Sequence, residues 1–323
     1  MSWGRAARAC IERCEGSQGH HQRWHFQHGP IDLVIGIYGP SLVIDEAIEQ
    51  AWARFEQILP ELVAELAFLK APVPTGIGDV SAFRAPQPMG PIARRMFESC
   101  TPYGQLDKTF LTPMAAVAGC VAQEVIGYLQ APGIEKAWVN NGGDIAWYAS
   151  HANPSVFKVG IPELPEAAAI TLRATDQCWG VATSGWRGRS QSFGIADSVT
   201  VIARHAGQAD VAATLIANQV SLGDRMVSHP KIVQKPANQV KDESDLGDRL
   251  VTVEVGRLSS SEIQGALDAG EKYALDLLSR DWIQGAVLSL QGQFRICGGF
   301  LPQVLEDDHP WHTPVAFGAR VQG

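Results

Sequence analysis

The sequence has no long apolar run and no apolar segment behind its basic N-terminus. No apolar stretch reaches the roughly 18–20 residues that a membrane-spanning helix needs. Arg5, Arg8 and Arg13 are not followed by the apolar core of a signal peptide. We therefore expect a cytoplasmic protein that makes no membrane contact.

The six cysteines do not form the pattern of a metal site or a disulfide framework. Cys10 and Cys14 are close in sequence, but no second close pair completes a zinc site. Cys120 and Cys178 lie in apolar runs, which predicts core thiols. A chain of 323 residues has enough core to be stable without disulfides.

The sequence also has fewer basic than acidic residues. Lysine and arginine total 26 against 34 acidic residues, for a net charge of −8 and a pI near 5.6. This balance argues against a general nucleic-acid binder. If the protein binds an anion, we expect local groups such as backbone amides or a metal to hold it. The composition is otherwise globular, with 46% hydrophobic and 19% charged residues.

The apolar pattern indicates an α/β (α+β) protein, with an N-terminal extension at 1–22 and a single domain at 23–323. Helices are predicted at 45–69, 112–129, 208–220 and 260–279. Two strands are predicted within 23–38, around a turn at Gly29-Pro30. Further strands are predicted at 136–139, 145–148, 156–161, 168–174, 197–203, 285–290 and 293–297. Residues 1–23 are expected to be irregular, Pro60 to break or kink the first helix, 71–91 to form a loop, and 228–248 to be a mobile insertion.

The first candidate site is the turn from Asn141 through Gly142 and Gly143 to Asp144, placed between two predicted strands. Paired glycines permit positive φ and let a ligand approach the backbone, where amides can face a phosphate or carboxylate. Asp144 then offers a carboxylate to a ribose hydroxyl, a ring nitrogen or a metal. The alternative is an ordinary tight hairpin, since Asn-Gly and Gly-Asp are common turn pairs.

The second candidate is the loop that begins at Thr183, Ser184 and Gly185 and continues through Ser190 and Ser192. Its hydroxyls, with Arg187 and Arg189 in the same loop, suit an anionic ligand, because arginine can bind an oxyanion with two parallel hydrogen bonds. The alternative is a solvated loop with surface arginines. No histidine or lysine stands beside Ser184 in sequence to activate it as a nucleophile.

The third candidate is the pair Asp210 and Thr214, which share one face of a predicted helix. With Asp210 in the first turn, a carboxylate and a hydroxyl could hold a hard cation such as Mg²⁺. Compensation of the helix dipole is the alternative reading. The N-terminal histidines His20, His21, His25 and His28 lack the clearer ligand set that a zinc site would need.

Taken in order, these segments resemble a bacterial and archaeal family related to ApbE, the FAD:protein FMN transferases. The resemblance covers about residues 23 to 300. The matching segments are Thr112 to Gly119, Val139 to Ile145, Val181 to Gly185, Ser190 to Ser198, and Ala209 to Thr214 with Asn218. Each motif is weak alone, and their shared order makes the resemblance specific.

The resemblance implies an ApbE-like, T-fold-type domain with mixed sheets and helices, and ligands of the FAD or FMN type with Mg²⁺. By residue match, Gly142, Gly143 and Asp144 correspond to the flavin-binding turn. Asp210 and Thr214 correspond to the magnesium ligands. Thr183 to Gly185 match the family's Thr-Ser-Gly segment.

Two departures argue against FMN transfer. The transferases have Lys-Gly where this chain has Ala118-Gly119, and His-x-x-Asp-Pro where it has 192–197, SFGIAD. Asp197 keeps a carboxylate near that lost motif.

The leading hypothesis from the sequence is therefore an ApbE-like protein, of transferase or hydrolase type, that binds a small anionic, nucleotide or flavin ligand. Asp144, Ser184 and Asp197 are its candidate catalytic groups, and Thr112 is a further candidate ligand contact. A flavin-independent hydrolase or ring-opening enzyme and a non-catalytic partner protein are the alternatives. Nine tryptophans and a Gly/Ala-rich helix lead us to expect a homo-oligomer.

Overall fold

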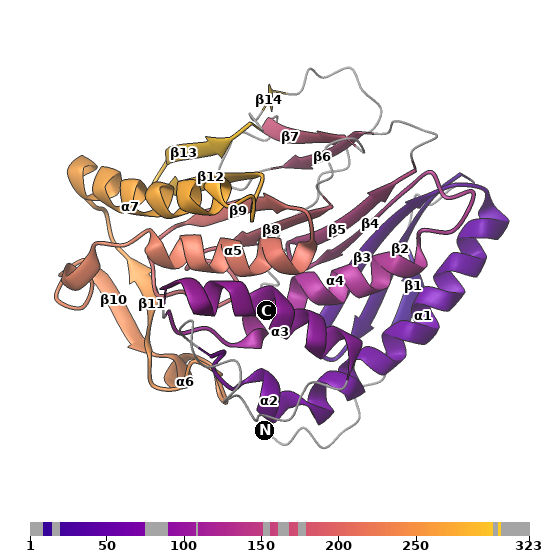
Figure 1. The fold of residues 1–323 in the computed structure, drawn as a ribbon, viewed down its shortest axis with the longest axis horizontal. Coiled ribbons are helices and arrows are strands. Elements are labelled where there is room, and N and C mark those ends of the chain that lie inside the picture. The colour runs from indigo at the N-terminus through magenta and orange to yellow at the C-terminus, as the bar shows by residue number, and fades with distance from the viewer. Residues whose placement is uncertain are drawn as a thin grey trace. The chain divides into compact units, whose positions relative to one another are not determined.

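The computed structural model (Figure 1) describes residues 9–14, 20–74, 90–107, 109–150, 156–160, 168–173, 179–299 and 303–304. The chain divides into two compact units. The first comprises Met1–Val156, Arg173–Gly180 and His205–Gly207, and the second Phe157–Leu172, Val181–Arg204 and Gln208–Gly323. Strands and helices occur in both, which confirms the predicted α/β class. The single domain predicted for 23–323 stays a prediction.

The first unit contains five antiparallel strands that follow one another in chain order. They are β1 (Cys10–Arg13), β2 (His21–His28), β3 (Ile31–Tyr38), β4 (Lys136–Asn141) and β5 (Asp144–Ala149). The two strands predicted around Gly29-Pro30 are confirmed. The prediction that residues 1–23 are irregular is wrong for Cys10–Arg13, which pairs with β2 so that Arg13 lies opposite Trp24. Such a short polar edge strand forms because its neighbour supplies the backbone partners.

The helices of the first unit are α1 (Ser41–Ala64), α2 (Leu66–Leu69), α3 (Pro91–Asp107), the 3₁₀ turn η1 (Pro113–Ala116) and α4 (Val117–Tyr128). Of the break or kink predicted at Pro60, the break does not occur, because α1 continues through this residue. Its buried stripe includes Phe55, Ile58 and Leu62, so packing on both sides of Pro60 offsets the lost backbone hydrogen bond.

The sequence did not predict α3, and residues 75–89 of the predicted loop at 71–91 lie outside the described residues. Thr112 and Pro113 stand at the N-cap and first position of η1, as expected.

Helices α1 and α4 pack on the strands of the first unit. Phe26 of β2 meets Trp52 and Phe55 of α1, with ring centroids 5.1 and 5.4 Å apart. Helix α4 packs on β4 and β5, and Figure 1 shows α1 and α4 running along the strands. The core of this unit therefore lies between the strands and these helices.

The second unit contains three groups of strands. Strands β8 (Gly180–Ser184), β9 (Ser198–Ala203), β12 (Gly285–Leu290) and β13 (Gln293–Gly298) neighbour one another in that order. A smaller group has the order β14 (Gln303–Val304), β7 (Ala168–Arg173) and β6 (Val156–Gly160). The strands predicted at 156–161, 168–174, 197–203, 285–290 and 293–297 are therefore confirmed within a residue or two. Cys178, predicted to be a core thiol, lies outside the described residues, whereas Cys120 is buried as expected.

The third group is a pair of strands that the sequence did not predict. β10 (Ile232–Pro236) pairs with β11 (Leu250–Val255), and α6 (Ala237–Val240) follows β10. The segment 228–248, predicted to be a mobile insertion, thus contains β10 and α6. The other helical elements of this unit are α5 (Ala206–Gln219), η3 (Gly223–Arg225) and α7 (Ser260–Ser279). Among the described residues, no helix has the length and apolar character to cross a bilayer.

The start of α7 depends on its cap. The Ser259 hydroxyl accepts from the Glu262 amide, and the Glu262 carboxylate accepts from the Ser259 amide at 2.8 Å, which makes a capping box. Hydrogen bonds from Ser259 and from His229 lower the pKa of Glu262 to about 2. Because this pKa is depressed, the stabilisation is present above the usual pKa of glutamate and is lost as the pH falls toward about 2.

We expect Ser259→Ala to reduce the free energy of unfolding by about 1 kcal/mol, because the first turn of α7 loses its side-chain acceptor. Urea denaturation at neutral pH measures the loss. Ser260→Ala is the control, since the Ser260 side chain is exposed and makes no capping bond. Equal losses in the two variants would contradict a specific role for the cap.

Candidate functional site

The turn between β4 and β5 consists of Gly142 and Gly143 alone. Their φ values of 66° and 119° suit glycine, and Asn141 pairs directly with Asp144 across the turn. The Gly143 amide donates to Asn140 Oδ1 at 2.8 Å. This amide therefore has a partner inside the hairpin, and the expectation that the glycine amides face a ligand stays a prediction.

The same turn is tied to α4. Asn141 Nδ2 donates to the carbonyl oxygen of Ala118 at 3.1 Å, so the hairpin is held against the first turn of α4. Asp144 begins β5 and is only 9% exposed. Thr112 is buried ahead of η1. The first unit thus brings together Asn141, Asp144 and the first turn of α4.

In the second unit, the end of β8 lies against the residues that precede β9. A Cβ on Gly185 would stand 2.5 Å from the Asp197 carbonyl oxygen and 2.9 Å from that of Ala196, so only glycine permits this approach. The hydroxyls of Thr183 and Thr200 lie 2.9 Å apart. The Thr-Ser-Gly segment and Asp197, which belong to separate sequence motifs, are therefore neighbours in space.

Asp197 is almost fully buried, and both of its carboxylate oxygens accept hydrogen bonds. Oδ1 accepts from Arg187 Nε at 2.7 Å and from Trp186 Nε1 at 3.2 Å. Oδ2 accepts from the Gln291 backbone amide at 2.5 Å. The carboxylate thus joins the loop after β8 to the turn between β12 and β13.

Ser192 and Ser190 have different surroundings although both were predicted to contact a ligand. Ser192 is 2% exposed, and its hydroxyl donates to Asn218 Oδ1 at 3.0 Å. The Phe193 amide donates to the same oxygen at 2.8 Å. Ser190 is exposed. Asn218 therefore anchors this loop on α5, a role that sequence reasoning missed although Asn218 stood among the family motifs.

Asp210, Thr214 and Asn218 recur every four residues along α5 and so share one face of the helix. The helix starts at Ala206 and has no acidic residue in its first turn, so the prediction that Asp210 lies in the first turn is wrong. Asp210 is 8% exposed, and Thr214 is half-buried. Because the dipole effect fades beyond the first turn, it does not account for a buried carboxylate here.

The part of the chain that the structure describes has few groupings of metal-ligating side chains. It contains no group of three or more His, Cys, Asp or Glu residues placed to hold a metal ion. The N-terminal histidines are engaged separately: His20 lies 2.9 Å from Glu135, and His25 lies 2.8 Å from Asp32. His21 stacks on a tyrosine ring of β3, and burial lowers its pKa.

The family model described as AbpE bacteria matches residues 14–296. The chain belongs to this family. The ApbE-like family predicted from the order of the motifs is thereby confirmed.

Relatives of this AbpE bacteria chain include archaeal proteins described as UPF0280 proteins. One from Methanobrevibacter smithii is 29% identical over 197 residues, covering 61% of this chain and 66% of its own length. One from Methanosphaerula palustris is 38% identical over 112 residues, covering 34% and 47%. The chain thus spans between about half and two thirds of the length of these curated relatives.

Solved structures with a related description are more distant. The flavinyl transferase ApbE of Pseudomonas stutzeri, in its apo form, is 15% identical, with 93% of this chain and 94% of that chain covered and a TM-score of 0.37. The flavin transferase ApbE of Vibrio cholerae is 12% identical, with 91% and 100% covered and the same TM-score of 0.37. At this TM-score the likeness carries no argument about ligand or reaction.

Proposed function

We propose that this AbpE bacteria protein binds a small anionic ligand of the nucleotide or flavin type together with Mg²⁺. The observation that carries the proposal is the position of Asp210. Its carboxylate is buried one turn inside α5, with the Thr214 hydroxyl on the same helix face.

The donor set fits magnesium that is shared with a phosphate ligand. Asp210 and Thr214 supply the hard oxygen atoms that Mg²⁺ prefers. Mg²⁺ in nucleotide enzymes is usually held by one or two carboxylates, while water and substrate phosphates complete its six positions. We therefore expect the metal and the phosphate ligand to bind together rather than separately.

In this proposal the end of β8, which lies in the same unit as Asp210, makes the remaining polar contacts. Thr183 and Ser184 would offer hydroxyls to the ligand. Ala118 stands where the transferases have lysine, and the His-x-x-Asp-Pro motif is absent from the sequence. The proposed chemistry therefore does not include FMN transfer to a protein.

Calorimetric titration with FAD, FMN and ATP, each with and without Mg²⁺, tests this function. We expect at least one of them to bind in a Mg²⁺-dependent manner. Asp210→Asn should weaken that binding on the order of 100-fold, because a metal-binding oxygen becomes a neutral amide. Glu254→Gln, which removes an exposed carboxylate from β11, is the matched control.

Two results would overturn the proposal: no binding of any of the three compounds, or equal affinities in the two variants. A flavin-independent hydrolase is the second candidate, favoured by Ala118 and by the missing histidine. It predicts that the protein binds none of FAD, FMN and ATP and instead binds a smaller phosphate compound with Mg²⁺.

A further inference from the structure

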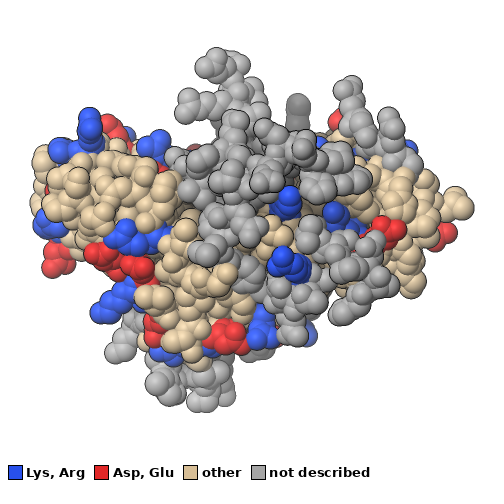
Figure 2. All heavy atoms as spheres, turned by 90° about the horizontal axis from the view of Figure 1, so that it is seen from above, with Lys and Arg blue, Asp and Glu red and all other residues tan. Residues whose placement is uncertain are grey.

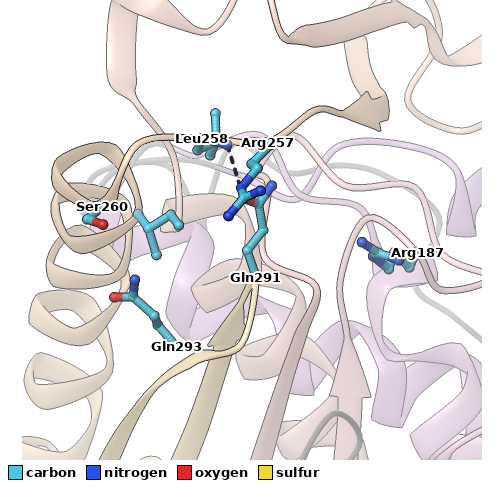
Figure 3. A pocket seen from close by; sticks show the side chains of 7 residues that line it. Arg187, Arg257, Leu258, Ser260, Gln291 and Gln293 are labelled. Carbon is cyan, nitrogen blue, oxygen red and sulfur yellow. Dashed lines mark hydrogen bonds between the residues drawn. The ribbon is translucent and has the colours of Figure 1, made fainter.

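The second unit contains a pocket of about 470 Å³ beside the start of α7. Arg187, Arg257, Ser260, Gln291 and Gln293 supply its polar lining (Figure 3). The chain carries a net charge of −8, and both signs of charge are interspersed on the face drawn in Figure 2. A pocket with two arginines is therefore a local exception to the overall charge.

Arg187 is held in a way that leaves its outer nitrogens available. Its Nε donates to Asp197 Oδ1 at 2.7 Å, and its guanidinium lies 4.9 Å from the ring centre of Trp186. Among the described residues, nothing else pairs with this side chain, which is 54% exposed. The guanidinium is therefore oriented from behind, while its two terminal nitrogens remain free to donate to a ligand.

Arg257 has no ion-pair partner among the described residues, yet the backbone on both sides of it is anchored. Gln291 Nε2 donates to the Gly256 carbonyl oxygen at 2.8 Å, and Gln291 Oε1 accepts from the Leu258 amide at 3.1 Å. The second of these bonds is the dashed line in Figure 3. Gln291 thus anchors the segment that presents Arg257 to the pocket.

Both arginines depend on the same carboxylate. One oxygen of Asp197 holds the Arg187 side chain, and the other holds the backbone of Gln291. Gln291 adopts a φ of 46°, which is rare for a residue with a side chain. A positive φ at both Gln291 and Gly292 is what the two-residue turn between β12 and β13 requires, and this turn places Gln291 in the pocket lining.

We propose that this pocket is an oxyanion site that binds the phosphate group of a small molecule without a metal. The terminal nitrogens of Arg187 and the guanidinium of Arg257 donate to the phosphate oxygens. The carboxamide of Gln293 and the hydroxyl of Ser260 contact the rest of the ligand. Asp197 is the positioning residue. Its negative charge and the positive charges of Arg187 and Arg257 sum to a net charge of +1 at the pocket. The site goes beyond the proposed function, since it needs neither Mg²⁺ nor Asp210.

Calorimetric titration of the full chain with inorganic phosphate and pyrophosphate, in EDTA at constant ionic strength, tests the pocket. Arg187→Gln and Arg257→Gln should each weaken binding about tenfold, because each removes a charge-assisted donor. Arg225→Gln removes an exposed arginine outside the pocket and should change little. Asp210→Asn should also leave this metal-free binding intact, which separates the pocket from the proposed magnesium site.

Asp197→Asn distinguishes positioning from simple charge. Removing a negative charge beside the pocket would by itself strengthen phosphate binding. If Asp197 positions Arg187, the same variant instead weakens binding several-fold, and it adds little further weakening in an Arg187→Gln background. Circular dichroism checks that the variant is folded, and Arg257→Gln tests the pocket without disturbing an ion pair.

Absence of phosphate and pyrophosphate binding would overturn the proposal, as would equal affinities in the Arg257→Gln and Arg225→Gln variants. Tighter binding by Asp197→Asn would overturn the positioning role.

Discussion

Glu124→Gln is expected to lower the free energy of unfolding by about 3 kcal/mol, the low end of the cost of breaking a buried ion pair, because the buried guanidinium group of Arg54 loses one of its two carboxylate partners. Glu124 of α4 accepts from Arg54 Nε of α1 at 2.7 Å and from Arg95 of α3 at 2.9 Å. The Glu124 and Arg54 side chains are only 10% and 11% exposed. Arg54 also forms a two-bond pair with Glu61. The network therefore joins three helices of the first unit.

The effect should depend on pH. Burial opposes ionisation of Glu124, but the hydrogen bonds and charges of Arg54 and Arg95 outweigh it, so that its pKa is lowered. A carboxyl group with a depressed pKa stabilises the fold above its usual pKa of 4.5 and loses that contribution as the pH falls through the lowered value. The difference between the wild type and Glu124→Gln should therefore be full at pH 7 and shrink in acid.

Urea denaturation of both proteins at neutral pH and at low pH measures this difference. Glu98→Gln, which changes an exposed residue of α3, should shift stability by no more than about 0.5 kcal/mol. A Glu124→Gln loss as small as that of the control would show that the three-helix network contributes little.

Gly194→Ala is expected to destabilise the protein by about 3 kcal/mol, at the upper end of the usual cost of overpacking. A Cβ at this position would lie 2.0 Å from the Ala217 carbonyl oxygen and 2.8 Å from that of Val220. Both atoms belong to the backbone, so no side-chain rotation relieves the clash. The loop must move away from α5, which disturbs the bonds from Ser192 and Phe193 to Asn218.

Thermal unfolding compares this variant with Gly265→Ala. Gly265 is an exposed residue of α7 with no atom within 4 Å of an added Cβ, so alanine there should stabilise the helix by about 0.5–1 kcal/mol. Both variants replace glycine by alanine, but one is expected to lower the stability of the protein and the other to raise it. A Gly194→Ala protein as stable as the wild type would contradict the close approach of this loop to α5.

The local features of this chain could be read from the sequence because their causes are local. The turn at Gly142-Gly143 follows from the two glycines between apolar strands, and the apolar spacing of 260–279 predicts α7, whose N-cap the structure places at Ser259. The family also followed from the sequence, because the order of its motifs survives at low identity. The turn and the helix depend only on residues that are near in sequence, and the family depends only on the order of motifs along the chain.

The first errors arose where packing overrules a local preference. The continuation of α1 through Pro60 depends on apolar contacts with the rest of the first unit. Helix α3 contains Pro102 and Gly104, and its low helix propensity hid it from the sequence reading. Asp210 was predicted to lie in the first turn of its helix but lies beyond it. The reason is that α5 begins at Ala206, two residues before the predicted start.

The surroundings of the candidate site depended on tertiary structure alone. The sequence placed Arg187 in a polar loop and Asp197 at the start of the next predicted strand, and it left open whether this carboxylate was catalytic or structural. Its partner Gln291 is 94 residues away, and Gln291 in turn anchors the backbone around Arg257. No periodicity or local motif encodes a hydrogen bond across such a separation. Only the folded chain brings those groups together, because the pairing of β9 with β12 sets the start of one strand beside the turn that follows the other.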